Sequence, residues 1–313
     1  MPNWKVIITD GLSKKGKTIL SADAEVKDYS GISAQELLDS IGDCNALIVR
    51  GRTKVTTALL EAAPKMKVVG RAGVGVDNID LAAAQSRGVT VINSPTATTI
   101  AVAEHTLALM LALVRNISRA DYSMKSGLWE KKQLAGAELY AKTLGIIGMG
   151  NIGSGVAQRA AAFGTHILGY DPFLDDAAIR QRAAQPAALN DLLAQSDLIS
   201  LHIPLTPETR GMINGQTIGL MKRGASLICA ARGGIIDETA LLNALESGQI
   251  AGAALDVFGT EPPGLTALVS HPNVVATPHI GAQTQEAQER AAVDISEEVL
   301  AALKGEPLRW KIV

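Results

Sequence analysis

Short apolar runs alternate with helix-like patterns along the first third of the chain. Strands are predicted at residues 5–9, 46–50, 67–73 and 89–93, which read KVIIT, ALIVR, KVVGRAG and VTVIN. Helices are predicted at residues 33–38, 56–63 and 80–87. The first helix opens with Ser33 and Glu36, whose spacing is that of a capping box. Strands that alternate with helices in this way indicate βαβ units and a parallel sheet.

A second series of strands follows a long helical pattern that runs from about Ile100 to Ser126. Its strands are predicted at residues 144–148, 166–171, 198–203, 226–231, 253–257 and 273–278. An amphipathic helix over about Gln285–Lys304 completes the pattern. Together the two series predict an α/β protein with two doubly wound parallel-sheet domains.

The composition fits two globular domains and argues against several kinds of partner. The chain has 313 residues, of which 47% are hydrophobic and 19% charged, so disorder is not expected. A formal net charge of −2 does not favour nucleic acid or an anionic membrane as a partner. The apolar stretch Ile100–Val114 carries Glu104 and His105, so we expect a core or subunit-interface helix there and no membrane span.

Cys44 and Cys229 are too few for a disulfide framework and lack the spacing of a metal site, which predicts a reduced, cytoplasmic setting. The sequence MPNWKVIITD enters a strand almost at once, so no targeting segment is expected. The five histidines show no metal-ligand spacing, and we expect no metal.

A glycine-rich turn, GMGNIG, lies between the predicted strand at residues 144–148 and a helical pattern. This context matches a dinucleotide-binding fingerprint, whose glycines permit a tight turn, close approach of a pyrophosphate and close helix–strand packing. The helix N-terminus would offer its N–H groups to the phosphates. The expected cofactor contacts are Gly148, Gly150, Asn151, Ile152 and Gly153.

Asp171 ends the next predicted strand, 18 residues beyond Gly153. Its carboxylate could accept hydrogen bonds from a ribose diol and would repel a 2′-phosphate, and Pro172 and Phe173 supply no cation to neutralise one. This favours NAD over NADP. The alternative is a glycine turn with a surface aspartate, but strand, spacing and helix agree on the cofactor site.

A second glycine-rich stretch, GRAGVGVD, occupies residues 70–77 and has no acidic partner at a following strand end. Its backbone N–H groups could bind a small anion such as a substrate carboxylate. It could equally be a structural loop, and the pattern alone does not decide.

Ionisable side chains stand at or just beyond three predicted strands of the second series, where ligands bind in a doubly wound sheet. They are Arg232, Asp256, Glu261 and His279, expected near the nicotinamide half of the cofactor. An imidazole that transfers a proton, a carboxylate that orients it and a guanidinium that grips a carboxylate suit the interconversion of 2-hydroxy and 2-keto acids. Each has a structural alternative, namely an ion pair for Arg232, a solvated loop position for Glu261 and a bond to a carbonyl for His279.

Four more residues at these strand ends are expected to line the cofactor site: His202, Pro204, Ala230 and Gly281. For His202 a purely structural role is an equal alternative. His105, within the apolar helix, is assigned to the core or to an interface.

Seven segments together carry a resemblance that covers nearly the whole chain. They are VRGRTKVT (49–56), VVGRAGVGVDNIDLAAA (68–84), VAEHTLALML (102–111), KTLGIIGMGNIG (142–153), ARGGIIDE (231–238), AALDVFGTEPP (253–263) and TPHIGA (277–282). On these segments the chain resembles the D-isomer-specific 2-hydroxyacid dehydrogenases, most closely their 3-phosphoglycerate dehydrogenase branch.

The resemblance implies a Rossmann NAD-binding domain, residues 99–284, inserted into a flavodoxin-like substrate-binding domain of residues 1–98 and 285–313. It also implies a cleft between the domains and a homodimer joined through the NAD-binding domains, with a tetramer as a further possibility. Because the chain ends soon after its last helix, it is expected to lack the regulatory domains of long-form relatives and serine feedback through them.

The same resemblance assigns roles to single residues. His279 corresponds to the acid/base, Glu261 to its partner and Arg232 to the substrate-binding arginine. Asp256 corresponds to a ligand of the nicotinamide carboxamide. Substrate contacts are implied for Arg50, Val74, Gly75, Val76 and, reaching across to the partner subunit's substrate, Lys131. Arg52 and Lys54 are further candidates to hold a distal anion.

Four departures from the family pattern lie near the expected site: Cys229 for Asn, Ala97-Thr98 for Gly-Asn, Gln283-Thr284 for Ser-Thr, and Lys131 for Arg. The expected reaction is NAD-dependent oxidation of 3-phosphoglycerate to 3-phosphohydroxypyruvate, in serine biosynthesis. Alternatives are a hydroxypyruvate or glyoxylate reductase, a sulfolactate dehydrogenase and, more distantly, an NAD-sensing binding protein without activity.

Overall fold

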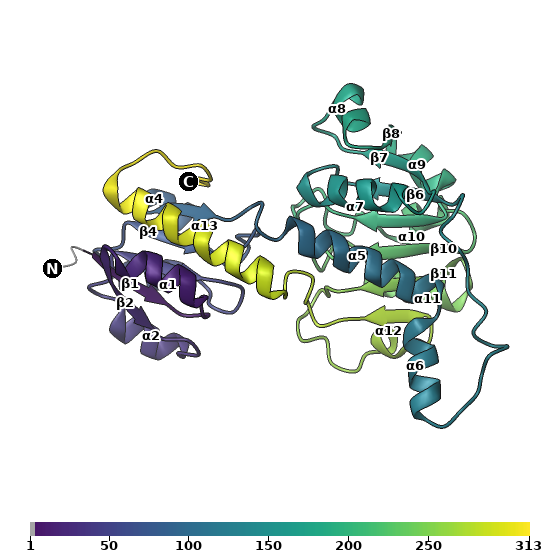
Figure 1. Cartoon of the computed structure of the whole chain (residues 1–313), viewed down its shortest axis with the longest axis horizontal. Helices are drawn as coiled ribbons and strands as arrows, with labels where there is room; N and C mark the ends of the chain where they lie inside the picture. Colours follow the sequence, from purple (N-terminus) through teal and green to yellow (C-terminus); the bar gives the residue numbers. More distant parts are fainter. Residues whose placement is uncertain (1–3) are drawn as a thin grey trace. The chain divides into compact units, whose positions relative to one another are not determined.

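The computed structural model describes residues 4–313, whose helices and strands form two compact units (Figure 1). Unit 1 comprises the described residues up to Thr99 together with Ala282–Val313, and unit 2 comprises Ile100–Gly281. The first three residues lie outside the described range, and with them part of the sequence behind the expectation about a targeting segment.

Unit 1 is built on a five-stranded parallel sheet with the order β2-β1-β3-β4-β5. Its strands are β1 (Trp4–Ile8), β2 (Ala24–Asp28), β3 (Ala46–Val49), β4 (Val68–Arg71) and β5 (Thr90–Asn93). Its helices are α1 (Lys14–Ser21), α2 (Ala34–Ser40), α3 (Thr57–Glu61), α4 (Leu81–Ser86) and α13 (Gln285–Lys304). This is the flavodoxin-like order, in which the winding direction reverses between β1 and β3.

Alternation of side chains along the buried strands gives unit 1 two apolar layers. One layer, with Val6 and Ile8, packs against α1 and α13, which lie side by side over the sheet (Figure 1). The opposite layer, with Ile7, packs against α2, α3 and α4. A Cβ on Gly70 would lie 2.7 Å from Val299 Cγ2, so the glycine that opens the GRAGVGVD stretch serves close packing of α13.

Unit 2 contains a seven-stranded parallel sheet with the order β12-β11-β10-β9-β6-β7-β8. Its strands are β6 (Thr143–Ile147), β7 (His166–Tyr170), β8 (Gln185–Pro186), β9 (Leu198–Leu201), β10 (Ala225–Cys229), β11 (Ile250–Leu255) and β12 (Val274–Ala276). Its helices are α5 (Thr99–Val114), α6 (Ile117–Lys125), α7 (Asn151–Ala161), α8 (Asp176–Gln181), α9 (Leu189–Gln195), α10 (Gly215–Gly219), α11 (Glu238–Glu246) and α12 (Ala267–Ser270). The reversal between β6 and β9 is that of a Rossmann sheet, so the predicted fold class is confirmed.

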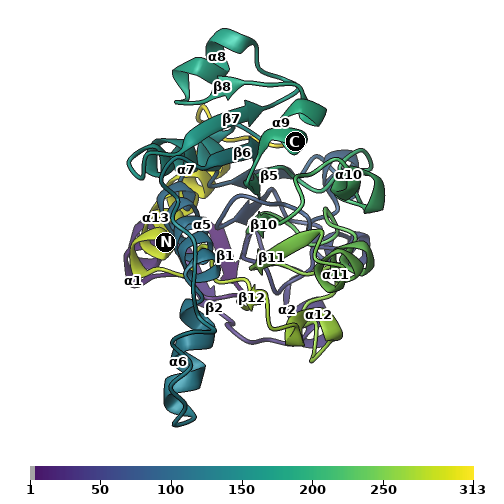
Figure 2. The same ribbon diagram turned by 90° about the vertical axis from the view of Figure 1, so that its right-hand side faces the viewer.

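The long helix predicted over about 100–126 is two helices. Asn116 has a φ of 54°, a left-handed conformation that cannot continue a right-handed helix, and it separates α5 from α6. Beyond this break α6 extends away from the seven-stranded sheet (Figures 1 and 2). Within residues 4–313 no single helix is long and apolar enough to cross a membrane; only α5 and α6 as a pair, bent by 65°, meet that measure.

Candidate active site

The predicted ionisable residues lie at one edge of the unit 2 sheet, where its parallel strands end. Asp256 directly follows β11, Arg232 comes shortly after β10, and His279 shortly after β12. Glu261 lies in the loop that leaves β11. Ligands of doubly wound sheets bind at this edge, so these loops are the part of unit 2 to examine for chemistry.

His279 and Glu261 are hydrogen-bonded. His279 Nδ1 lies 2.8 Å from Glu261 Oε2, and Glu261 Oε1 accepts the Phe258 N–H at 3.1 Å. A carboxylate can only accept, so the ring proton sits on Nδ1 and Nε2 is left to face a ligand. The His279 side chain is 50% exposed, which leaves it accessible to a substrate.

The backbone of His279 adopts a left-handed conformation with a φ of 54°. Non-glycine residues rarely adopt this conformation, and they do so mainly where the surrounding structure holds them there. Here the His279 N–H donates to the Asp256 carbonyl at 2.9 Å. The loop therefore fixes both the backbone and, through Glu261, the ring.

Asp256 is the anchor of this loop. Its side chain is 1% exposed, and its carboxylate accepts the N–H groups of Ile280 at 2.9 Å and Gly281 at 2.8 Å, and the Thr277 hydroxyl at 2.6 Å. Burial alone would raise the pKa of Asp256, but the hydrogen bonds from His105, Thr277 and the two amides outweigh it and lower the pKa. An ionised carboxylate thus holds the segment on both sides of His279.

His105 completes this network from α5. Its Nε2 lies 3.2 Å from Thr277 Oγ1 and 3.3 Å from Asp256 Oδ1. The sequence analysis assigned His105 to the core or an interface and missed this connection to the site. The available signal was a histidine within an otherwise apolar helix, and only the tertiary structure shows which carboxylate it meets.

Arg232 is partly buried, and its Nη1 donates to the Ala231 carbonyl at 2.6 Å. Cys229, which stands where the family usually has Asn, is 1% exposed and its thiol donates to the Arg232 carbonyl at 3.7 Å. Burial raises the pKa of the Cys229 thiol to about 11. The thiol therefore stays protonated near neutral pH and supports the backbone of Arg232.

The glycine turn of unit 2 has the geometry of a phosphate cradle. A Cβ on Gly153 would collide with the Gly148 carbonyl, and Gly148 has a φ of 94°, so both positions require glycine. A Cβ on Gly150 would meet no atom within 4 Å, so open space lies above the turn. Gly150 is the N-cap of α7 and has no side chain to bond the N–H groups of Asn151, Ile152 and Gly153. The residues present therefore fit a pyrophosphate.

Asp171 follows β7 directly, beside this turn. Its Oδ2 accepts the Met149 N–H at 2.9 Å and its Oδ1 accepts the Phe173 N–H at 3.0 Å. Each carboxylate oxygen has further acceptor capacity for a ribose hydroxyl. The expected ribose contact stays a prediction.

Three more expected cofactor residues lie at neighbouring strand ends. His202 follows β9, with Nε2 2.8 Å from Ser200 Oγ, and burial lowers its pKa to about 4. Pro204 is exposed two residues further on, and Ala230, 9% exposed, follows β10. His202 is thus neutral near neutral pH, which fits the structural alternative as well as a cofactor contact.

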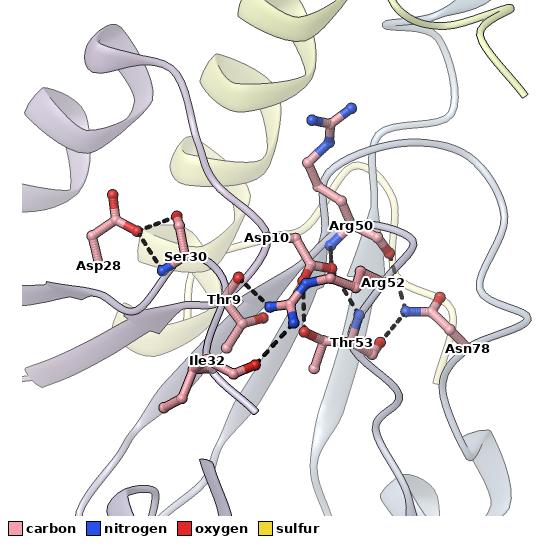
Figure 3. Close-up of polar contacts among 9 residues, drawn as sticks. All are labelled: Thr9, Asp10, Asp28, Ser30, Ile32, Arg50, Arg52, Thr53 and Asn78. Atoms are coloured by element: carbon pink, nitrogen blue, oxygen red, sulfur yellow. Dashed lines mark hydrogen bonds and ion pairs between the residues drawn. The ribbon is translucent and has the colours of Figure 1, made fainter. Parts of the chain in front are cut away.

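The basic residues after β3 in unit 1 differ in what they can bind (Figure 3). Arg52 donates to the carbonyls of Ile32 at 2.9 Å and Thr9 at 2.7 Å, and its Nε lies 3.3 Å from Asp10 Oδ1. These bonds commit its guanidinium to the fold and remove it from the candidates for a distal anion. Lys54 and, in unit 2, Lys131 are exposed.

Arg50 keeps its guanidinium apart from this network (Figure 3). Its Nη2 lies 3.4 Å from Oε1 of Gln283, one of the residues that depart from the family pattern. Burial lowers the pKa of Arg50, and the Asp10 carboxylate opposes this shift. The amides of Val74, Gly75 and Val76 donate no hydrogen bond to protein atoms within residues 4–313, as an anion-binding loop requires.

Comparison with known proteins agrees with this arrangement. Residues 107–281 match the family described as D-isomer specific 2-hydroxyacid dehydrogenase, NAD binding domain. A D-3-phosphoglycerate dehydrogenase of Methanocaldococcus jannaschii is 47% identical over 303 residues, which are 96% of this chain and 58% of that protein. The chain thus spans little more than half the length of this curated relative.

Two solved structures match over nearly the whole chain. The TT0316 protein from Thermus thermophilus is 35% identical with a TM-score of 0.89, over 99% of this chain and 100% of that one. D-Lactate dehydrogenase from Aquifex aeolicus, in complex with NAD and lactic acid, is 32% identical with a TM-score of 0.84, over 96% of each chain.

Proposed function

Because the chain belongs to the D-isomer specific 2-hydroxyacid dehydrogenases, we propose that it oxidises a small anionic 2-hydroxy acid with NAD. The preferred substrate is 3-phosphoglycerate and the product 3-phosphohydroxypyruvate, a step of serine biosynthesis. The observation that carries this proposal is the 2.8 Å bond between His279 and Glu261. The choice of substrate draws support from the name of the 47%-identical relative, D-3-phosphoglycerate dehydrogenase.

The proposed chemistry assigns the proton to His279. Its Nε2 accepts the hydroxyl proton of the substrate as the carbonyl forms, and the same atom returns a proton in the reverse direction. Glu261 holds Nδ1–H and stabilises the imidazolium that this transfer creates, because its carboxylate carries the opposite charge. Arg232 binds the substrate carboxylate and polarises the reacting oxygen.

NAD, when bound, accepts the hydride that leaves the hydroxyl-bearing carbon. The turn Gly148–Gly153 and the N-terminus of α7 would hold its pyrophosphate, and the Asp171 carboxylate would accept the ribose hydroxyls of its adenosine half. The nicotinamide half would lie against Asp256, Gly281, Ala230, His202 and Pro204. The repulsion between Asp171 and a 2′-phosphate gives the preference for NAD.

Unit 1 acts as the substrate-binding domain in this proposal, and unit 2 as the NAD-binding domain. Arg50 and the amides of Val74–Val76 supply positive charge and donors to an anionic substrate. A substrate with a second anion, such as a phosphate, would use more of these groups than lactate or glyoxylate can.

The assembly we propose is a homodimer joined through unit 2. Large apolar side chains are exposed on α6 and the segment after it: Ile117, Tyr122, Met124, Leu128 and Trp129. Because several large apolar side chains are exposed within this short segment, we place the dimer interface there. The exposed Lys131 follows Trp129 and would then contact the substrate of the partner subunit.

We also propose a cytoplasmic location. Cys44 and Cys229 are free and buried, which suits a reducing compartment.

A substrate panel tests the proposal. NADH formation should be followed at one pH with 3-phosphoglycerate, glycerate, lactate and sulfolactate. We expect the highest kcat/KM for 3-phosphoglycerate. A higher kcat/KM for lactate or sulfolactate would overturn the substrate assignment, but the proposed reaction class, oxidation of a 2-hydroxy acid with NAD, would stand. A protein that binds NADH and oxidises none of the four would contradict the proposed activity.

A further inference from the structure

The loop that carries Arg50 lies at the point where the winding of the unit 1 sheet reverses. Residues 50–53 follow β3, and Asp10 lies just beyond the neighbouring strand β1. In a doubly wound sheet, ligands bind where two adjacent strands lead to opposite faces. The side chains that shape this loop therefore bear on ligand binding, although the sequence analysis named neither Asp10 nor Asn78.

Asp10 holds the loop from one side (Figure 3). Its Oδ2 accepts the N–H groups of Arg50 at 2.8 Å and Thr53 at 3.0 Å, and its Oδ1 accepts the Thr53 hydroxyl at 2.6 Å. The Asp10 side chain is 4% exposed. A buried carboxylate with this many donors is costly to rearrange, because any lost bond leaves a buried charge less well satisfied.

Asn78 holds the same two residues from the other side (Figure 3). Its Nδ2 donates to the Arg50 carbonyl at 3.0 Å and to the Thr53 carbonyl at 2.6 Å. Arg50 and Thr53 thus each have both backbone polar groups bonded by a side chain, the N–H by Asp10 and the carbonyl by Asn78. We call this arrangement the Asp10–Asn78 clamp.

The clamp fixes the direction in which Arg50 leaves the backbone without using its side chain. Both partners bond its peptide groups, and the guanidinium points away from them (Figure 3). Arg52, two residues on, is instead bonded to the Thr9 and Ile32 carbonyls. The loop therefore commits one guanidinium to its own structure and presents the other to a ligand.

We propose that Asp10 and Asn78 are positioning residues that hold Arg50 in the orientation needed to bind the anionic substrate. The proposal rests on the substrate role proposed for Arg50 above. Because the clamp already fixes the backbone of Arg50, less backbone entropy is lost when a ligand binds its guanidinium, and the clamp contributes in this way to substrate affinity. Its hydrogen bonds join residues of unit 1 and involve none of the groups proposed to transfer the proton or hydride. We therefore expect turnover of bound substrate to change little.

The test measures the Kd for 3-phosphoglycerate by calorimetry, and kcat and KM with NAD, on the full chain. Asp10→Asn exchanges one acceptor oxygen for an amino group that faces N–H donors, and Asn78→Ala removes both carbonyl contacts. In each variant Kd and KM should rise about tenfold, with kcat and the Kd for NADH within about twofold of wild type. Asp28→Asn is the matched control, since Asp28 also accepts a loop N–H, that of Ser30 at 3.1 Å, after β2.

The double variants separate positioning from a general loss of structure. With Arg50→Ala already present, Asp10→Asn should raise the Kd by less than about twofold, because its effect acts through Arg50. If Kd and KM are unchanged in both single variants, or if the losses in the double variant are fully additive, the positioning role of the clamp is overturned. The proposed function is not affected by either result. A wild-type protein that neither binds nor oxidises 3-phosphoglycerate overturns the proposed function, and the role of the clamp in binding it falls too. Thermal melting of each variant shows whether it folds. If one single variant does not fold, the Kd and KM of the other single variant test the positioning role.

Discussion

His279 Nδ1 and Glu261 Oε2 lie 2.8 Å apart, which joins the loop after β12 to the loop after β11 through a charge-assisted hydrogen bond. The bond fixes which ring nitrogen carries the proton and which faces a ligand. It is also the contact on which the proposed proton transfer depends, since that transfer would form an imidazolium in each oxidation.

Glu261→Gln should lower kcat by about 10- to 100-fold, because the amide can still bond Nδ1–H but no longer offsets the charge of the imidazolium. NADH binding should stay within about twofold of wild type. Steady-state rates with 3-phosphoglycerate and NADH fluorescence titration check both values. Glu246→Gln, exposed on α11, is the control. Wild-type turnover in Glu261→Gln would show that the pair is structural only.

Asp256→Asn should destabilise the folded state by about 1–3 kcal/mol at neutral pH, because the amide cannot accept all the bonds that the carboxylate accepts. The folded state lowers the pKa of Asp256, so the unfolded state binds its proton first as pH falls. The contribution is present above the unfolded pKa of about 3.9 and is lost as pH falls through the folded value. Urea unfolding at several pH values should show the difference between wild type and variant shrinking below about pH 4.

Asp171→Ala should weaken NADH binding relative to NADPH by about tenfold or more, since the variant loses ribose hydrogen bonds and the repulsion of a 2′-phosphate. Fluorescence titration with both cofactors measures the ratio. Asp176→Ala, an exposed carboxylate on α8, serves as the comparison. An unchanged ratio in Asp171→Ala would remove the ribose contact from the account.

His202 also makes the stability depend on pH, but here protonation creates a charge, whereas at Asp256 it removes one. Its folded pKa of about 4 lies below the usual value near 6.5, so the unfolded state takes up the proton first. Stability should therefore fall between about pH 6.5 and 4, by roughly 3 kcal/mol from this residue. His202→Gln should flatten the Tm profile over that range, whereas His166→Gln at the exposed start of β7 should not. Parallel profiles for wild type and His202→Gln would contradict the assignment.

The parts of the fold that depend on local pattern were predictable. The buried strand β3 is a continuous apolar run, and α13 has the predicted bounds Gln285–Lys304 because its amphipathic pattern is long and capped by Thr284. The capping box of Ser33 and Glu36 is confirmed. The sequence analysis did not predict β2, since this edge strand reads AEVKD and exposes polar side chains.

The parts that depend on contacts distant in sequence were not predictable. The break at Asn116 needs a single left-handed residue within a helical pattern. His105 meets Asp256 more than a hundred residues away, and Asn78, after β4, meets Arg50, after the neighbouring strand β3. Asp10 did carry a signal, since it follows the strand KVIIT as Asp171 follows its own strand. The same position just after a strand could have marked Asp10 as a residue near the site.

The most direct test of the central claim is turnover by His279→Gln with NAD and 3-phosphoglycerate. If His279 transfers the proton, kcat should fall by about 10²- to 10⁴-fold while the Kd for NADH stays within about twofold of wild type. A variant that keeps turnover within about tenfold of wild type, with NADH still bound, would contradict the account.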